Sequence, residues 1–242
     1  MKKHKGLKLG VVAVLLLCGV CWAYAAGYYH ADDIAVAAMS SATDVTVEQK
    51  GNTIAFIPED AETGLIFYPG GKVEYSAYAP LMRALADSGV LGVLVRMPLN
   101  LAVLDVNAAK GIPEQYPKIK HWYIGGHSLG GSMAASHAAK NTSTYDGLVL
   151  LASYSTADLR ASGLPVISIF GSEDGVLNME KYAECRRNFP TVFEEHIIEG
   201  GCHAGFGSYG PQDGDGVPTI TGEVQLAETV QLLTAFFKSK QE

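Results

Sequence analysis

Residues 123–140 read YIGGHSLGGSMAASHAAK, and Ser128 stands in the pattern GHSLG within them. An apolar, strand-like run precedes Ser128, and a helix-like run rich in small residues follows it. A G-x-S-x-G pattern between a strand and a helix is typical of a serine on a sharp, strained turn, where the two glycines avoid steric clashes. Backbone N–H groups at the start of the helix would face negative charge that develops beside the serine. Ser128 is therefore a candidate nucleophile, and a small-residue turn needed only for packing is the alternative.

A serine nucleophile needs a base, and three histidines lie downstream of Ser128. His137 is expected on the helix surface, because its place further along the helix puts it about 13 Å away along the axis. His196 falls inside the strand-like run TVFEEHIIEG and is expected to be a partly exposed sheet residue. His203 follows that run in a flexible, glycine-bracketed loop at the carboxyl end of the sheet. Sites in parallel sheets form at that edge, so His203 is the predicted base.

Two carboxylates are candidates for orienting His203. Asp174 follows the strand-like run VISIFG and is expected on the same edge, where it would accept the second ring N–H of His203 and stabilise the imidazolium. Asp158 lies one strand nearer Ser128, in a stretch that also resembles a helix start. Glu173 should point to the other side of its strand. The pattern favours Asp174, with Asp158 as the second candidate.

The loop FYPGGKV, residues 67–73, is the candidate for binding the oxyanion of a tetrahedral intermediate. Its two glycines would let backbone N–H groups approach a substrate oxygen, and the residue after the nucleophile would supply a further N–H. The predicted oxyanion residues are Gly71, Lys72 and Leu129. An ordinary glycine turn is the alternative interpretation.

Strand-like and helix-like runs alternate along residues 44–242, which predicts one α/β domain with a mainly parallel sheet and helices on both faces. Residues 45–58 are expected to form a hairpin that turns at Lys50-Gly51-Asn52. Further strands are expected in the runs at 64–71, 90–97, 121–126, 147–154, 166–171 and 191–200. The last helix should bury one apolar stripe made of Leu226, Val230, Leu233 and Phe237.

The first 30 residues differ from the rest of the chain. Four lysines among the first eight residues precede a run at 9–29 without a charged residue, and about 20 apolar residues are enough to cross a bilayer as a helix. We expect residues 1–30 to be an uncleaved membrane anchor, with residues 31–43 as a spacer or surface helix. A cleaved signal peptide is the alternative, since Ala23-Tyr24-Ala25 has the form of a processing site. The positive charge upstream puts the domain outside the cytoplasm, either membrane-anchored or secreted.

The charge balance argues against one class of partner. The chain has 18 Lys and Arg against 25 Asp and Glu; without the four N-terminal lysines, 14 basic residues remain and the net charge is −11. A domain this acidic, without a basic cluster, is a poor candidate for binding nucleic acid.

Four cysteines and an acidic turn remain. Cys18 and Cys21 sit in the apolar run and are interpreted as membrane-facing residues. Cys185 and Cys202 are predicted to form a disulfide, because one would lie on the helix before the last strand and the other in the loop after it. The stretch DGDG at 213–216 lacks the spaced ligands of a calcium loop and is interpreted as a turn near the mouth of the site.

Taken together, the motifs YPGGKVEYSAYAPL, VRMPLN, GGHSLGG, FGSEDG and GGCHAGFGSYGPQDGDG resemble the α/β-hydrolase superfamily, and more closely its small, membrane-anchored or secreted bacterial-type branch. The resemblance covers about residues 44–240. It implies an eight-stranded type of sheet, a triad of Ser128, His203 and Asp174, and no metal or organic cofactor. Many relatives carry a long lid after the sixth strand, whereas here only residues 155–165 separate Tyr154 from Val166, so an open, lidless site is expected.

Three functions are compatible with this pattern. The leading one is a serine hydrolase that cleaves a small-molecule carboxylic ester, or a thioester or amide, through an acyl-enzyme. An acyltransferase would use the same residues with an alcohol in place of water. A membrane-tethered binding module without activity is the third, and the filled triad positions argue against it.

Overall fold

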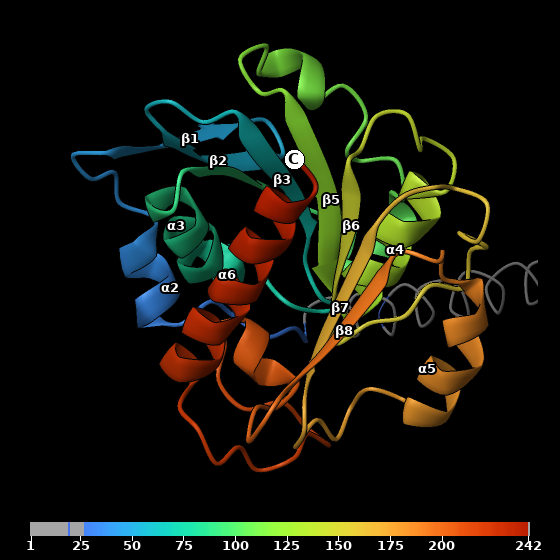
Figure 1. The fold of residues 1–242 in the computed structure, drawn as a ribbon. Coiled ribbons are helices and arrows are strands. Elements are labelled where there is room, and N and C mark those ends of the chain that lie inside the picture. The colour runs from blue at the N-terminus through green and yellow to red at the C-terminus, as the bar shows by residue number, and fades with distance from the viewer. Residues whose placement is uncertain (1–18, 20–26, 242) are drawn as a thin grey trace, which may run out of the picture.

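The computed structural model describes residue 19 and residues 27–241. In this part of the chain, eight strands form one sheet in the order β1-β2-β4-β3-β5-β6-β7-β8 (Figure 1). The strands are β1 (Val45–Lys50), β2 (Thr53–Pro58), β3 (Thr63–Tyr68), β4 (Val90–Val95), β5 (His121–His127), β6 (Gly147–Leu151), β7 (Val166–Gly171) and β8 (Phe193–Ile198). The predicted mainly parallel α/β fold is confirmed.

The sheet combines an antiparallel edge with a parallel remainder. β1 and β2 form the predicted hairpin, and Gly51 at its turn has a φ of 60°, which favours glycine. β2 also pairs antiparallel with β4, whereas every pair from β4 through β3 to β8 is parallel. All residues of β3, β4, β6 and β7 are buried, as expected for parallel strands covered on both faces.

Five α-helices accompany the strands within the described residues. They are α2 (Asp33–Ala38), α3 (Ala79–Asp87), α4 (Leu129–Ala138), α5 (Met179–Cys185) and α6 (Gly222–Ser239). Short 3₁₀ turns occupy η1 (Tyr75–Tyr78), η2 (Pro98–Asn100), η3 (Ala102–Leu104), η4 (Pro113–Gln115), η5 (Arg186–Asn188) and η6 (Ala204–Phe206). In Figure 1, α3 and α6 cover one face of the sheet and α4 lies on the other.

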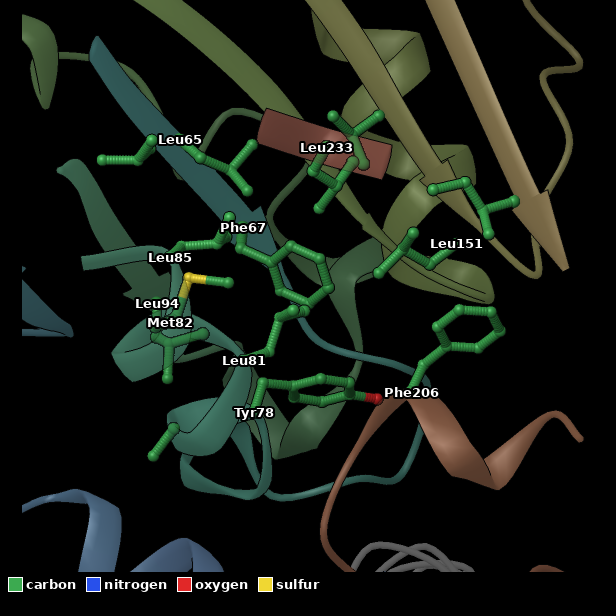
Figure 2. Packing of buried hydrophobic residues seen from close by; sticks show 14 of the residues in the cluster. Leu65, Phe67, Tyr78, Leu81, Met82, Leu85, Leu94, Leu151, Phe206 and Leu233 are labelled. Atoms are coloured by element: carbon green, nitrogen blue, oxygen red, sulfur yellow. The ribbon is translucent and has the colours of Figure 1, made fainter. Parts of the chain in front are cut away.

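The larger core cluster lies between the sheet and the helices α3 and α6. Figure 2 shows Leu81, Met82 and Leu85 of α3 against Phe67 of β3, with Leu233 of α6 closing the cluster. A second cluster fills the other face, where small residues of α4 let that helix lie close to β5 and β6. Pro80 occupies the first turn of α3, where a missing N–H is tolerated.

The buried face of α6 differs from the predicted stripe. Leu233 and Phe237 are fully buried, but Leu226 and Val230 are only partly buried, and Gln225 lies deep in the interior instead. The amide of Gln225 accepts a hydrogen bond from the backbone N–H of Cys202 at 3.0 Å and donates to its carbonyl at 2.8 Å. Because the amide finds both partners, a polar side chain can occupy an interior position.

Residues that precede the predicted domain boundary at residue 44 pack against the domain. Tyr29 forms a parallel bridge with Val73, and its ring lies against Tyr209. In the predicted spacer at 31–43, α2 packs on α3 and its Ala35 is fully buried. Most of the anchor predicted over 1–30 lies outside the described residues. Within the described residues, no helix is long and apolar enough to cross a bilayer.

The predicted disulfide between Cys185 and Cys202 is wrong, because both cysteines are free and buried. Cys185 ends α5, which packs through Tyr182 on Ser168 of β7. Cys202 belongs to the core cluster on the α6 side of the sheet, together with Ile169 of β7. Neighbouring residues of a strand point to opposite faces, so the sheet separates the two thiols.

The connection between β6 and β7 forms no lid. Residues 152–165 contain neither helix nor strand in the structure. This agrees with the open, lidless architecture expected from the short spacing between these two strands.

Candidate active site

Ser128 occupies the sharp turn between β5 and α4. Its backbone has φ 52° and ψ −123°, a conformation that non-glycine residues rarely adopt. The N–H of Ser128 donates to the carbonyl of Leu151 at 2.9 Å, so the end of β6 holds the turn in place. The strained turn predicted from the sequence is therefore present, and strain of this kind clusters at functional sites.

Two glycines allow the turn to form. A Cβ on Gly126 would lie 2.5 Å from the carbonyl oxygen of Tyr68 and 2.7 Å from the carbonyl carbon of Gly130. A Cβ on Gly130 would overlap the carbonyl oxygens of Tyr68 and Pro69. Since real Cβ atoms do not approach backbone this closely, both positions exclude a side chain. The steric reason expected for the GxSxG glycines is confirmed.

The hydroxyl of Ser128 is available for chemistry. Ser128 is the N-cap residue of α4, but its side chain makes no capping hydrogen bond, and the residue is half-buried. Leu129 is the first residue of α4, so its N–H has no acceptor within the helix. The positive end of the helix dipole therefore lies beside the Ser128 oxygen.

His203 and Asp174 form a buried pair. Nδ1 of His203 lies 2.9 Å and 3.1 Å from the two carboxylate oxygens of Asp174, and each side chain is 1% exposed. Oδ1 of Asp174 also accepts the backbone N–H groups of Val176 at 2.9 Å and Leu177 at 2.7 Å. Because an ionised carboxylate only accepts hydrogen bonds, Nδ1 of His203 carries the proton.

The other ring nitrogen of His203 is buried and has no partner. Nε2 is one of three buried polar side-chain atoms without a hydrogen bond among the described residues. Ser128 and His203 both line a cavity of about 230 Å³. No hydrogen bond joins Ser128 Oγ to His203 Nε2 in the described structure, and such contacts often tighten only when substrate is bound.

One of the three predicted oxyanion donors is wrong. The backbone N–H of Lys72 donates to the carbonyl of Asn100 at 2.8 Å, so it cannot point at a substrate oxygen. Gly71 remains a candidate, because its Cα lies against Leu129: a Cβ added there would be 3.0 Å from Leu129 Cδ2. The loop after β3 and the first turn of α4 are therefore neighbours, which leaves Gly71 and Leu129.

His127, the residue before Ser128, packs beside the candidate base and was not predicted from the sequence. It is fully buried, its Nδ1 lies 2.8 Å from the hydroxyl of Tyr78, and that hydroxyl accepts the N–H of Gly70 at 3.0 Å. The ring centroids of His127 and His203 are 4.4 Å apart. Burial holds the pKa of His127 well below its usual range, and the nearby His203 lowers it further. His127 is thus a neutral residue that contacts both Tyr78 and the ring of His203, and its place inside GHSLG is the only signal for it in the sequence.

The other two histidines downstream of Ser128 have different surroundings. His137 was expected on the helix surface, but it is buried, with Nδ1 3.1 Å from Asn107 and Nε2 3.0 Å from the hydroxyl of Tyr145. His137 is buried because the segment between β4 and β5, which contains Asn107, covers that face of α4. His196 is half-exposed on β8, as predicted.

The second candidate acid, Asp158, pairs with Arg160. Arg160 donates to both of its carboxylate oxygens, at 2.9 Å and 2.6 Å, and the two side chains are exposed. The hydrogen bonds from Arg160 lower the pKa of Asp158. The neighbouring acid Glu173 is also exposed, and its carboxylate accepts a hydrogen bond from Ser172. In the described structure, His203 has Asp174 as its only carboxylate partner at the ring.

Asp215 has contacts in the site that were not predicted from the sequence. The DGDG stretch does turn beside the site, but the Asp215 carboxylate accepts backbone N–H groups from Gly175, His203, Ala204 and Gly216. Burial raises the pKa of Asp215, but these four backbone hydrogen bonds outweigh burial, and the net pKa is lowered. Across the described residues, no three His, Cys, Asp or Glu side chains converge as metal ligands would.

Comparison with known proteins identifies the family and supports the fold. Residues 64–227 match the Alpha/beta hydrolase family. No curated protein matches the sequence. A dienelactone hydrolase from Anabaena variabilis is similar in structure, with a TM-score of 0.61, 16% identity, and 81% of this chain and 98% of that chain covered.

Two further solved structures are similar. An alpha/beta hydrolase enzyme from a sediment metagenome of the lagoon of Mar Chica has a TM-score of 0.60 and 14% identity, with 81% of this chain and 100% of that chain covered. Est1E from Butyrivibrio proteoclasticus with bound ferulic acid has a TM-score of 0.60 and 12% identity, with 82% of this chain and 98% of that chain covered. At these identities the likeness shows the fold alone.

Proposed function

The chain belongs to the alpha/beta hydrolase family, and we propose that it is a serine hydrolase that cleaves carboxylic esters of small molecules through an acyl-enzyme. The observation that carries the proposal is the state of His203: Nδ1 bonds to Asp174, Nε2 is buried and unpaired, and His203 lines the same cavity as Ser128. An imidazole with one nitrogen fixed and the other free beside a serine is suited to general base catalysis.

In the proposed first half-reaction, Ser128 Oγ attacks the ester carbonyl carbon while its proton passes to Nε2 of His203. The negative charge on the carbonyl oxygen is stabilised by the N–H groups of Leu129 and Gly71 and by the start of α4. His203 then gives the proton to the alcohol oxygen, the C–O bond breaks, and the acyl group stays on Ser128. Asp174 holds His203 in the required tautomer and stabilises the imidazolium.

In the second half-reaction, His203 removes a proton from water, which attacks the acyl carbonyl. The tetrahedral intermediate forms in the same oxyanion site, His203 returns the proton to Ser128 Oγ, and the carboxylic acid leaves. A thioester or an amide would follow the same steps with a different leaving group. The structural similarity to a dienelactone hydrolase supports an ester-type substrate.

Hydrolysis of p-nitrophenyl acetate by the purified chain tests this proposal. We expect the rate of hydrolysis to saturate with substrate concentration. A fluorophosphonate should lower this rate in proportion to the fraction of protein that it labels. A folded protein that turns over no aryl or alkyl ester and is not labelled would instead support the binding-module alternative.

The size of the cavity beside Ser128 leads to a prediction on substrate. Its volume of about 230 Å³ lies below the roughly 300 Å³ at which pockets for drug-sized ligands begin. Its walls include Ser132, Tyr154 and Leu177, and a volume of this size holds a short acyl group more readily than a long alkyl chain. We therefore propose that the enzyme prefers short acyl groups.

In a series of p-nitrophenyl esters from acetate to decanoate, kcat/KM is expected to be highest for the shortest acyl groups and to fall roughly tenfold or more by octanoate. Leu177→Ala should move the preference toward longer acyl groups, because it enlarges this wall of the cavity. Octanoate cleaved as fast as acetate by the unaltered enzyme would refute the proposed preference and leave the nucleophile in place.

We also propose that the domain acts outside the cytoplasm, held by its N-terminal segment or released by cleavage. The four lysines before the apolar run at 9–29 support this orientation. Alkaline phosphatase fused after residue 242, expressed in a bacterium, should be active, because the reporter folds only outside the cytoplasm. An inactive reporter on a stably produced fusion would contradict the proposed orientation.

A further inference from the structure

The carboxylate of Asp215 connects the two loops that carry the proposed acid and base. Its Oδ1 accepts the N–H groups of Gly175 at 3.1 Å, His203 at 3.1 Å and Gly216 at 2.9 Å. Its Oδ2 accepts the N–H of Ala204 at 2.8 Å. Gly175 follows Asp174 directly, so one side chain holds the backbone at both members of the Asp174–His203 pair.

The loop that carries Asp215 also fits tightly against the turn that carries Asp174. A Cβ on Gly175 would lie 2.6 Å from the carbonyl oxygen of Gly214 and 2.8 Å from the nitrogen of Gly216. A Cβ on Gly216 would overlap the carbonyl of Glu173. The two loops therefore pack backbone against backbone, and Asp215 enters between them from a fixed position.

The segment around His203 needs such a contact. It contains five glycines between positions 200 and 210, and a chain of this composition is intrinsically flexible. Yet His203 is only 1% exposed and its ring meets Asp174 at hydrogen-bond distance. On one side, Gln225 binds the backbone of Cys202; on the other, Asp215 binds the N–H groups of His203 and Ala204.

We propose that Asp215 is a positioning residue, which holds the His203 loop in register with the Asp174 turn so that Nε2 of His203 faces Ser128. This inference rests on the proposed function, because the consequence of losing register is a loss of proton transfer. Hydrogen bonds from backbone N–H groups to an ionised carboxylate are stronger than those to neutral acceptors. A displacement of about 1 Å in such a group can lower the rate roughly 100-fold.

The same loop supplies a matched control. Asp213 lies two positions away, has the same charge, and is exposed; only its backbone N–H makes a hydrogen bond, to the hydroxyl of Tyr29. Asp213→Ala and Asp215→Ala thus make the same chemical change in one loop. Asp215→Asn is an intermediate variant, since an amide oxygen can still accept the three N–H groups that Oδ1 accepts.

The experiment measures kcat, KM and the thermal midpoint of each variant, with kcat divided by the number of sites that a fluorophosphonate titrates at completion. For Asp215→Ala we expect kcat per titrated site to fall roughly 100-fold with KM unchanged, because substrate binding does not use the displaced nitrogen. In Asp215→Asn, kcat per titrated site should fall less. In Asp213→Ala, it should equal that of the unaltered enzyme. A merely structural role would lower the midpoint and the number of titrated sites, but not kcat per site.

Equal kcat per titrated site in Asp215→Ala and the unaltered enzyme would overturn the inference and leave the proposed function standing. An equal fall in Asp213→Ala would overturn it as well, because the effect would then come from loop charge. If Asp215→Ala does not fold, kcat per titrated site is compared between Asp215→Asn and Asp213→Asn instead. Equal values in these two variants would overturn the inference. An unaltered enzyme that is neither labelled nor active would overturn the proposed function first, and this inference with it.

Discussion

Ser128→Ala is expected to abolish ester hydrolysis, with a fall in kcat on the order of 10⁶-fold. The variant lacks the atom that forms the acyl-enzyme, and only binding and oxyanion stabilisation remain to accelerate the reaction. Initial rates with p-nitrophenyl acetate, measured at high enzyme concentration, give the size of the loss.

The thermal midpoint of Ser128→Ala should stay close to that of the unaltered protein. The Ser128 side chain makes no capping hydrogen bond, and alanine meets the same strained backbone at φ 52°. Ser136→Ala is the matched control, because Ser136 lies on the same helix and donates only to the carbonyl of Ser132. Substantial activity in Ser128→Ala, or an equal loss in Ser136→Ala, would remove Ser128 from the mechanism.

Asp174→Asn is expected to lower kcat about 10⁴-fold. Asp174 meets Nδ1 of His203 at 2.9 Å and 3.1 Å in a buried setting. An amide cannot stabilise the imidazolium, and its NH₂ group, placed toward Nδ1, favours the wrong tautomer of His203. The comparison uses kcat per folded molecule, because Asp174 also accepts the N–H groups of Val176 and Leu177 and its replacement affects the turn.

Asp158→Asn is the control for this second prediction and should change kcat little. Asp158 is exposed and bound to Arg160, and its loss removes a surface ion pair that contributes little to stability. The reverse result, with the Asp158 variant inactive and the Asp174 variant active, would transfer the acid's role to the connection after β6.

Much of the fold and part of the site follow from patterns in the sequence. The pattern GHSLG between a strand and a helix predicts the turn at Ser128, although the backbone that excludes a side chain at Gly126 and Gly130 belongs largely to Tyr68 and Pro69, far away in the chain. Asp174 and His203 come after neighbouring parallel strands, β7 and β8, and the carboxyl ends of such strands share one edge. Periodicity and strand order were therefore enough to predict that the two would meet.

The features that sequence could not supply depend on partners distant in the chain. The N–H of Lys72 donates to the carbonyl of Asn100, and nothing in the motif VRMPLN that ends at Asn100 indicates this contact. His137 is buried because Asn107 and Tyr145 satisfy both ring nitrogens. Asp215 was predicted only as part of a turn near the mouth of the site, since nothing in DGDG reveals three backbone donors from other segments. Hydrogen bonds between segments distant in the chain therefore determine the surroundings of these polar groups, and local sequence patterns do not contain them.

Mapping the site of a fluorophosphonate adduct tests the central claim most directly. The full chain is labelled, digested, and analysed by mass spectrometry alongside protein that was denatured before labelling. The account predicts one adduct per chain, on Ser128, in the native protein, and none in the denatured one, because reactivity depends on His203 and the strained turn. An adduct on another serine, or a native protein that stays unlabelled, would contradict it.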